Sequence, residues 1–215
     1  MWFCALFIRT LSARRLRLDQ SETEGLTVLL VCPRRYGDAR GWFSETYHNT
    51  RFAAWGIDVT FIQDNHALSP VAGTLRGLHF QNAPFAQSKL IRCIRGAIFD
   101  VAVDLRRQSP TYGQWVAAEL SAENGDQLFV PAGYGHAYLT LTPDCEVVYK
   151  VDAHYAPQAD GGVIWNDPQI GIVWPDGGDA PLLSEKDQRL PRLADAMFDF
   201  AYDGKPLLPL VRIEQ

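Results

Sequence analysis

The chain has 215 residues, with 20 Lys and Arg against 25 Asp and Glu, which gives a formal net charge of −5. This balance disfavours a general nucleic-acid-binding protein, and 47% hydrophobic with 21% charged residues excludes large-scale disorder. A chain of this length can bury enough apolar surface to fold without disulfides or a structural metal.

The first 24 residues are predicted to be a poorly ordered tail, followed by a single domain over residues 25–215. The apolar residues 1–8 precede the nearby arginines, whereas a secretory signal carries its charge before its apolar stretch. A membrane-surface role for this tail is the weaker alternative, and no run approaches the ~20 apolar residues of a membrane span. We therefore expect neither a membrane nor a nucleic acid as partner.

The four cysteines are at least 28 positions apart, so the chain has no CxxC zinc or redox pair. They are interpreted as free thiols of a protein in a reducing compartment, and a cytoplasmic location is expected.

From Leu26 onward, short apolar or alternating runs predict β-strands separated by turn sequences rich in Gly, Pro and Asp. Helical periodicity is scarce: residues 50–56 predict a short helix ended by Gly56, and residues 184–196 predict a helix with a Ser184 N-cap, interrupted at Pro191. Many short strands with close turns predict an all-β sandwich or barrel, here a jelly roll. The predicted strands cover residues 26–31, 59–63, 114–120, 127–131, 136–141 and 146–151, with two more in 90–105 broken at Gly96.

Two segments fit the spacing of cupin motifs. The pattern Gly-x5-Pro-x-Gly-x2-His over residues 125–136 matches the second cupin motif up to its histidine, and Gly73-x5-His79 opens the first. A metal cupin would need a second histidine at position 81, which is Gln81 here. His79 and His136 alone do not make a transition-metal site, although His66 could add a third ligand. The motifs therefore predict a cupin barrel whose histidines move protons or bind ligand.

Eight further blocks, in order along most of the chain, carry a resemblance that is more specific than any one motif. With these blocks the chain resembles the dTDP-4-dehydrorhamnose 3,5-epimerase family of deoxysugar biosynthesis. The blocks are residues 37–47, 61–69, 74–81, 87–115, 120–141, 148–157, 164–175 and 182–187.

This resemblance implies an all-β, cupin-type jelly-roll barrel with a few short helices, mainly C-terminal. It implies an isomerase that inverts C3 and C5 of dTDP-4-dehydro-6-deoxyglucose to give dTDP-4-dehydrorhamnose. Such a reaction needs a base near neutrality, a stabiliser for the enolate oxygen and an acid on the opposite face of the sugar. No cofactor is expected, since the chain has no G-x-G-x-x-G fingerprint. Family precedent and exposed sheet edges imply a homodimer made by strand exchange.

The resemblance assigns catalytic roles to four residues. His79 is the base, because an ordinary histidine with a pKa of about 6.5 accepts a proton near pH 7. Tyr149 is the acid and Lys89 the enolate stabiliser. The carboxylate that orients His79 is placed at Asp187, which is 108 positions away.

Two other carboxylates are rivals for the partner of His79. Alternation places Asp100 on the face opposite Phe99 and Val101. Asp167 precedes Pro168 and is expected to cap a turn.

Further residues are implied in binding the nucleotide sugar. Arg76 suits bidentate contact with a phosphate, His136 contacts the substrate and Tyr155 stacks on thymine. Asp160 stands where the family usually has Glu, which shortens this side chain by one methylene. The remaining ligand contacts, some of them across the dimer interface, are Arg40, Glu45, Gln63, Asn65 and Lys186.

Three alternatives stay open from the sequence. A relative with the same fold could epimerise only C3 or only C5 of another nucleotide 4-keto-sugar. A metal cupin, either an oxygenase or a binding module, is disfavoured by the missing second histidine. A catalytically inactive binding barrel is disfavoured because His79, Tyr149, Asp187 and Lys89 are all present.

Overall fold

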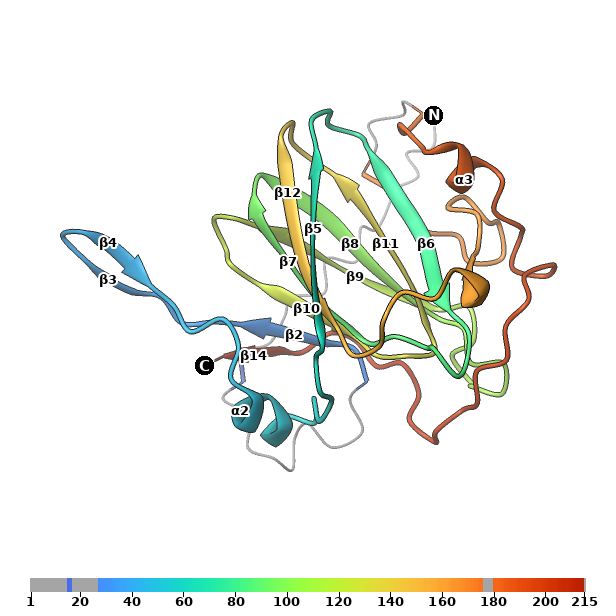
Figure 1. Ribbon diagram of the computed structural model, residues 1–215, viewed down its shortest axis with the longest axis horizontal. Helices are drawn as coiled ribbons and strands as arrows, with labels where there is room; N and C mark the ends of the chain where they lie inside the picture. The colour runs from blue at the N-terminus through green and yellow to red at the C-terminus, as the bar shows by residue number, and fades with distance from the viewer. Residues whose placement is uncertain (1–14, 17–26, 176–179, 215) are drawn as a thin grey trace, which may run out of the picture.

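Two facing β-sheets and one projecting hairpin make up most of the computed structural model, which describes residues 15–16, 27–175 and 180–214 (Figure 1). The predicted tail, residues 1–24, lies outside the described residues except for Arg15–Leu16, which form the short strand β1. The prediction of an all-β cupin-type jelly roll is confirmed.

The larger sheet has seven strands and the smaller one five. Apart from β1–β14 and β14–β2, which pair in parallel, the strands pair antiparallel. The seven-stranded sheet runs in the order β1, β14 (Arg212–Glu214), β2 (Leu29–Cys32), β10 (Gln127–Val130), β7 (Lys89–Arg95), β12 (Cys145–Val151) and β5 (Gln63–Ser69). The five-stranded sheet runs in the order β13 (Asp160–Gly162), β6 (Leu75–Gln81), β11 (Tyr134–Thr140), β8 (Ala97–Asp104) and β9 (Trp115–Ser121).

The apolar residues form three layers, because neighbouring side chains of a strand point to opposite faces. In β8, Ile98 and Ala102 face the core between the sheets. Val101 and Val103 face the outer side of the five-stranded sheet, which the segment after residue 162 covers. The third cluster packs helix α2 (Asn49–Ala54) against the outer side of the seven-stranded sheet. The smaller sheet is thus buried on both sides, which fixes the position of the strands that carry the site.

Most strand predictions are confirmed, with shifts of a few residues at the ends. Gly96, at φ 76°, separates β7 from β8 as expected. The prediction for residues 59–63 is wrong, because the strand β5 begins only at Gln63, and residues 59–62 lie before it. The sequence analysis also did not predict β6.

The helices are short. Helix α2 ends before Gly56, which has φ 89°, as predicted. Helix α3 (Glu185–Gln188) starts at the predicted Ser184 N-cap but is a single turn, so the prediction of a helix on to residue 196 is wrong. A residue before proline disfavours the helical region, so the turn stops ahead of Pro191. A 3₁₀ turn, η1, covers Pro157–Ala159. Within the described part of the chain, no helix is long and apolar enough to cross a membrane.

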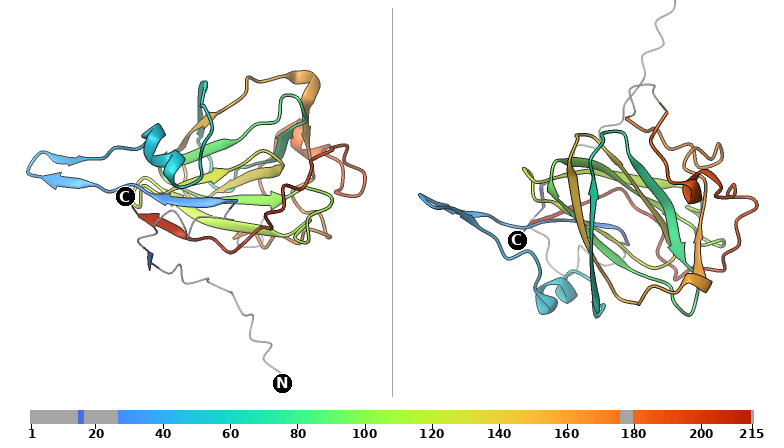
Figure 2. Two further views of the ribbon diagram at one scale, coloured as in Figure 1. Left: turned by 90° about the horizontal axis from the view of Figure 1, so that it is seen from below. Right: turned by 45° about the horizontal axis from the view of Figure 1, so that its top comes forward.

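The hairpin of β3 (Tyr36–Asp38) and β4 (Gly41–Phe43) projects away from both sheets, as Figures 1 and 2 show. Its side chains are exposed, including Tyr36 at 56%, Trp42 at 59% and Phe43 at 71%. We call this hairpin the arm. Exposed aromatic side chains on an unsupported hairpin indicate a surface that packs against something else.

Candidate active site

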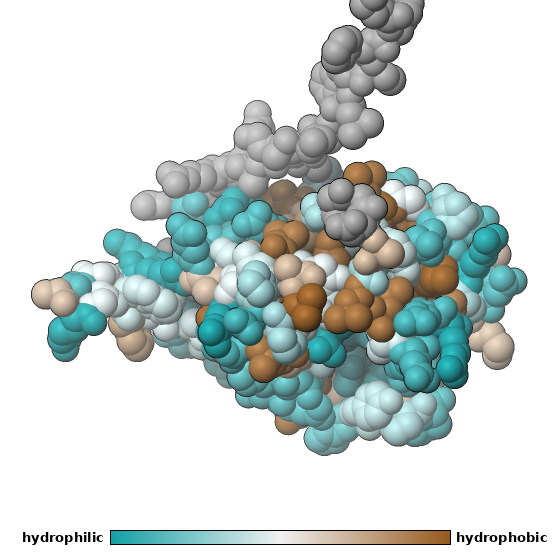
Figure 3. Space-filling model, turned by 90° about the horizontal axis from the view of Figure 1, so that it is seen from above, coloured by the Kyte–Doolittle hydropathy of each residue, from teal (hydrophilic) through white to brown (hydrophobic). Residues whose placement is uncertain are grey.

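A cavity of about 540 Å³ opens between the two sheets. Its lining comes from β5, β6, β7, β11 and β12, from the segment that leads into α3, and from α3 itself. Large apolar side chains stay exposed at this end of the molecule, including Leu68, Val71 and Leu182, and Figure 3 shows apolar atoms gathered in the middle of the face seen from above. Seven predicted site residues line the cavity: Arg76, His79, Lys89, His136, Tyr149, Lys186 and Asp187.

His79 and Asp187 meet although 108 residues separate them. The His79 Nε2 lies 2.5 Å from the Asp187 Oδ1. A β-bridge between Thr74 and Leu182 lays the chain before α3 along the start of β6. The Ser184 hydroxyl then accepts a hydrogen bond from the Asp187 N–H at 3.1 Å, which fixes the first turn of α3 and points its carboxylate at the histidine.

The Asp187 carboxylate is buried and stays charged. Burial alone raises its pKa, but hydrogen bonds from His79, Ser184 and the Gly77 backbone outweigh that effect and hold the pKa below the usual carboxylate range. A carboxylate only accepts hydrogen bonds, so the His79 Nε2 carries the proton and Nδ1 keeps its lone pair. The His79 side chain is 30% exposed, so this lone pair can reach a ligand.

Gly77 allows β6 to approach β11 closely. It has φ 118°, and an added Cβ would lie 2.5 Å from the His136 carbonyl oxygen and 2.7 Å from the Ala137 Cβ. Only glycine fits such a position without displacing the neighbouring strand. This approach sets His79 directly opposite His136 in the pairing of the two strands.

His136 has its own carboxylate partner. The His136 Nε2 lies 2.7 Å from Asp100 Oδ1, and both side chains are buried. Burial lowers the pKa of His136, partly offset by Asp100, with the charges of Lys89 and His79 lowering it further. Asp100 was a rival partner for His79 in the sequence analysis. The structure pairs it with the other histidine, and pairs His79 with Asp187 as predicted.

Lys89 begins β7 and faces the same cavity. Burial lowers its pKa to about 8, although the charges of Asp100 and Asp160 raise it and that of Lys186 lowers it. An ammonium with a pKa this low can change its charge near neutral pH, and its field is strong where water is excluded.

Tyr149 and Arg76 lie on facing strands that both line the cavity. Burial raises the pKa of Tyr149, partly offset by the Arg76 guanidinium, so the phenol is protonated at neutral pH. Arg76 is held by hydrogen bonds to the Ser69 hydroxyl at 3.3 Å and to the Leu68 carbonyl at 3.2 Å. The phenol and the imidazole of His79 thus reach the cavity from different sheets.

Three residues form a polar cluster beside the cavity. The Asp160 Oδ2 accepts a hydrogen bond from the Tyr155 hydroxyl at 3.1 Å and binds the Lys186 ammonium. The Tyr155 ring is 58% exposed. Asp160 and Tyr155 do not line the cavity themselves, and Lys186 links them to it.

The four other predicted contacts lie away from the cavity. Arg40 lies in the tip of the arm, 90% exposed, where it pairs with Asp38. Glu45 binds Arg51 at 2.7 Å. Gln63 and Asn65, which bond to each other at 2.8 Å, lie on β5, the edge strand next to Tyr149.

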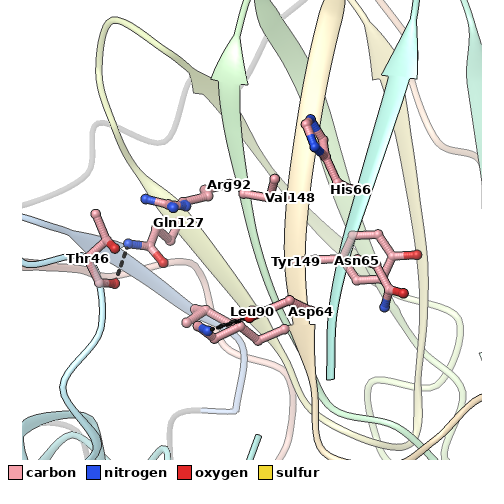
Figure 4. A pocket seen from close by; sticks show the side chains of 10 residues that line it. Thr46, Asp64, Asn65, His66, Leu90, Arg92, Gln127, Val148 and Tyr149 are labelled. Carbon is pink, nitrogen blue, oxygen red and sulfur yellow. Dashed lines mark hydrogen bonds and ion pairs between the residues drawn. The ribbon is translucent and has the colours of Figure 1, made fainter. Parts of the chain in front are cut away.

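His66 does not join the other two histidines. It lies on the opposite face of β5 from the cavity and bonds the Glu146 carboxylate at 2.9 Å. His66 lines a second cavity, of about 300 Å³, together with Arg92 and Gln127, and Tyr149 lines both cavities. Figure 4 shows His66 on the other side of Val148 from Arg92. No cluster of three or more His, Cys, Asp or Glu side chains suited to a metal ion exists among residues 15–16, 27–175 and 180–214.

Sequence reasoning missed some residues of the site and placed one correctly outside it. Tyr138, two residues after His136, lines the cavity and was not named; alternation along that strand could have found it. Asp167 accepts hydrogen bonds from the N–H groups of Gln169 and Leu193 at 2.8 Å each, so its predicted role in a turn is confirmed.

The cavity can therefore support proton transfer next to a polarised oxygen. It offers a carboxylate-oriented imidazole, a phenol on another strand, an ammonium and an arginine. This set matches a base, an acid, an oxyanion partner and an anion contact.

Comparisons with known proteins agree with this chemistry. The family model described as dTDP-4-dehydrorhamnose 3,5-epimerase matches residues 22–195. The dTDP-4-dehydrorhamnose 3,5-epimerase of Sinorhizobium fredii is 50% identical over 188 residues, which cover 86% of this chain and 96% of that protein.

Two solved structures are similar in fold and sequence. The Bacillus anthracis dTDP-4-dehydrorhamnose 3,5-epimerase with TDP and PPi bound is 49% identical with a TM-score of 0.72, over 74% of this chain and 90% of that one. The Legionella pneumophila dTDP-6-deoxy-D-glucose-3,5-epimerase in complex with dTDP-4-keto-L-rhamnose is 40% identical with a TM-score of 0.73, over 76% of this chain and 86% of that one.

Proposed function

The chain belongs to the dTDP-4-dehydrorhamnose 3,5-epimerase family, and we propose that it converts dTDP-4-dehydro-6-deoxyglucose to dTDP-4-dehydrorhamnose by inverting C3 and C5. The observation that carries the residue assignment is the His79–Asp187 pair, which opens onto a cavity that also holds Tyr149 and Lys89. A volume of about 540 Å³ is within the range of small-molecule sites.

The reaction begins with removal of the proton at C3 or C5, next to the C4 ketone. The His79 Nδ1 takes this proton, the C–H bond breaks, and its electron pair moves through the new C=C bond onto O4. The Asp187 carboxylate holds the imidazole in the Nε2–H tautomer and stabilises the imidazolium that forms.

The enolate oxygen needs a positive partner. The Lys89 ammonium supplies it in a half-buried position, where an opposite charge stabilises an oxyanion more than in water. Tyr149 then donates its hydroxyl proton to the carbon from the other face, which inverts the centre, and solvent restores both residues. The same cycle at the second carbon completes the product.

The nucleotide diphosphate meets the cationic side of the cavity. Arg76 and Lys186 offer a guanidinium and an ammonium for phosphate oxygens. Tyr155 offers an exposed ring for stacking on the base, and Asp160, the shorter replacement for Glu, holds the Tyr155 hydroxyl.

Solvent deuterium uptake tests this function directly. The protein is incubated with dTDP-4-dehydro-6-deoxyglucose in D₂O, and NMR locates the label. We expect label at C3 and C5 and conversion to the rhamno product. Label at one carbon only would identify a single-centre epimerase, and no label with intact nucleotide-sugar binding would contradict the proposed reaction.

The arm points to a site completed by a second copy of the chain. Arg40 and Glu45 lie on or next to the arm, outside the cavity that their proposed ligand would occupy. The edge strand β5 offers unpaired backbone groups beside Tyr149, and an exposed edge favours pairing with another chain. We propose a homodimer in which each arm lies along the partner's β5 and brings Arg40 to the partner's nucleotide.

Complementation between two inactive variants tests this arrangement. Arg40→Ala removes an arm contact and His79→Asn removes the base. In mixed dimers one site carries both changes and the other neither, so refolding an equal mixture should restore about a quarter of wild-type activity. If Arg40 serves the site of its own chain, no activity returns. A monomer by light scattering at assay concentration would also contradict the proposal.

A further inference from the structure

Asp100 is a buried carboxylate without a role in the reaction described above. It lies in the middle of β8, facing the interior between Ile98 and Ala102, and is 0% exposed. Burying a carboxylate is costly unless its charge is compensated. Its Oδ1 lies 2.7 Å from the His136 Nε2, while its Oδ2 has no hydrogen-bond partner among the described residues. The charge of such a group acts strongly on its neighbours.

The hydrogen bond to Asp100 decides which ring nitrogen of His136 carries the proton. The carboxylate can only accept, so the proton of neutral His136 sits on Nε2. Burial and the charges of Lys89 and His79 favour the neutral form. The Nδ1 atom makes no hydrogen bond to any described residue, and the ring lines the cavity. His136 therefore offers the cavity a lone pair that can accept a hydrogen bond from a ligand hydroxyl.

Asp100 also acts on Lys89. Lys89 lines the cavity together with Lys186 and with His136, which bonds Asp100. The charges of Asp100 on β8, Asp160 on β13 and Lys186 on α3 act on its pKa. The two carboxylates favour the charged ammonium and oppose the effect of burial, with Asp100 the larger of the two. Without Asp100, only the carboxylate of Asp160 would oppose the repulsion between the Lys89 and Lys186 ammonium groups. Asp160 is already paired with Lys186.

We propose that Asp100 is a positioning residue that never touches the substrate, holds His136 in the Nε2–H tautomer so that its Nδ1 can accept a hydrogen bond from a sugar hydroxyl, and keeps Lys89 charged beside the ketone oxygen. The inference rests on the proposed epimerase function. The two histidine–carboxylate pairs differ in their surroundings. The His79 side chain is 30% exposed and that of His136 only 9%, and burial and the charges of Lys89 and His79 lower the pKa of His136 by more than Asp100 raises it.

A direct titration of Lys89 tests the electrostatic part without reference to catalysis. Each protein is labelled with trace acetic anhydride across a pH series, and mass spectrometry follows acetylation at Lys89. We expect a midpoint near pH 8 in the wild type and a lower midpoint in Asp100→Asn, because removal of the negative charge disfavours the ammonium. Asp144→Asn, an exposed turn residue, is the matched control and should leave the midpoint unchanged. An unchanged midpoint in Asp100→Asn would show that Asp100 does not keep Lys89 charged.

Kinetics test the consequence for turnover. We expect the wild-type kcat to fall above about pH 8 as Lys89 loses its proton, and Asp100→Asn to shift that fall to lower pH. Loss of the oriented acceptor should also raise KM by up to about 10-fold, the range of one hydrogen bond. In a His136→Asn background, Asp100→Asn should no longer raise KM but should still shift the alkaline fall. A full KM effect in that background would show that Asp100 does not act through His136.

A second variant guards against misfolding, and the Lys89 titration separates failure of this inference from failure of the proposed function. Asp100→Ser makes the same charge change and leaves room for a water beside His136, so it replaces the asparagine variant if that one does not fold. If wild-type protein takes up no deuterium from solvent into the substrate, the proposed function fails, but the Lys89 midpoint still decides whether Asp100 sets the charge of that ammonium.

Discussion

Replacing His79 by asparagine should lower kcat by about 10²–10⁴-fold, the usual contribution of a general base. Asparagine leaves a smaller polar side chain at this position, and it has no lone pair basic enough to take a proton from carbon. Deuterium uptake into the sugar at both C3 and C5 should fall by the same factor, because the first step of both inversions is lost.

The measurement is kcat and the exchange rate from the same NMR time course, with binding of dTDP as a check that the site is intact. His66→Asn is the matched control, because His66 lies on the outer face of the sheet, bonded to Glu146. We expect wild-type rates for it. Exchange at wild-type rates in His79→Asn would remove His79 from the role of base.

Most of the strands that apolar alternation predicted help to build the cores, but so does β6, which carries Leu75, Leu78 and Phe80 and was not predicted. β7, β8, β11 and β12 each carry an apolar face, and all four were predicted close to their observed positions. β5 was missed because its inward face carries Gln63 and Asn65 and its outward face Asp64 and His66, so neither face is apolar. A strand that borders a polar cavity therefore lacks the signal by which strands are recognised.

The site residues also divide into those that a local sequence pattern can identify and those that it cannot. The cupin spacing singled out His79 and His136, which pair across β6 and β11. Asp187 was reached only through the family resemblance, because no local pattern links residues 108 positions apart. Alternation placed Asp100 correctly on the face opposite Phe99 and Val101, but it did not show that this face is buried between the sheets, and it could not decide between the two histidines. That choice depends on which strands are neighbours, a property of the sheet order rather than of any one segment.

Replacing Tyr149 by phenylalanine should lower the rate of epimerisation by about 10²–10⁴-fold while leaving the first proton transfer in place. The substitution removes one oxygen and keeps the ring, so the wall of the cavity is preserved. His79 can still take the proton from carbon, exchange it with solvent and return it to the same face. We therefore expect deuterium to enter the starting sugar with retention of configuration, much faster than the rhamno product forms.

This combination of exchange without inversion separates the two roles. A variant that lost only substrate binding would lose exchange and product together, as would a misfolded one. Tyr112→Phe is the matched control, since Tyr112 is a half-buried tyrosine packed near Phe198, outside the cavity, and should give wild-type exchange and product. Product formed at the wild-type rate by Tyr149→Phe would mean that the proton on the second face comes from another group, and Tyr138, which lines the same cavity, would then be the next residue to replace.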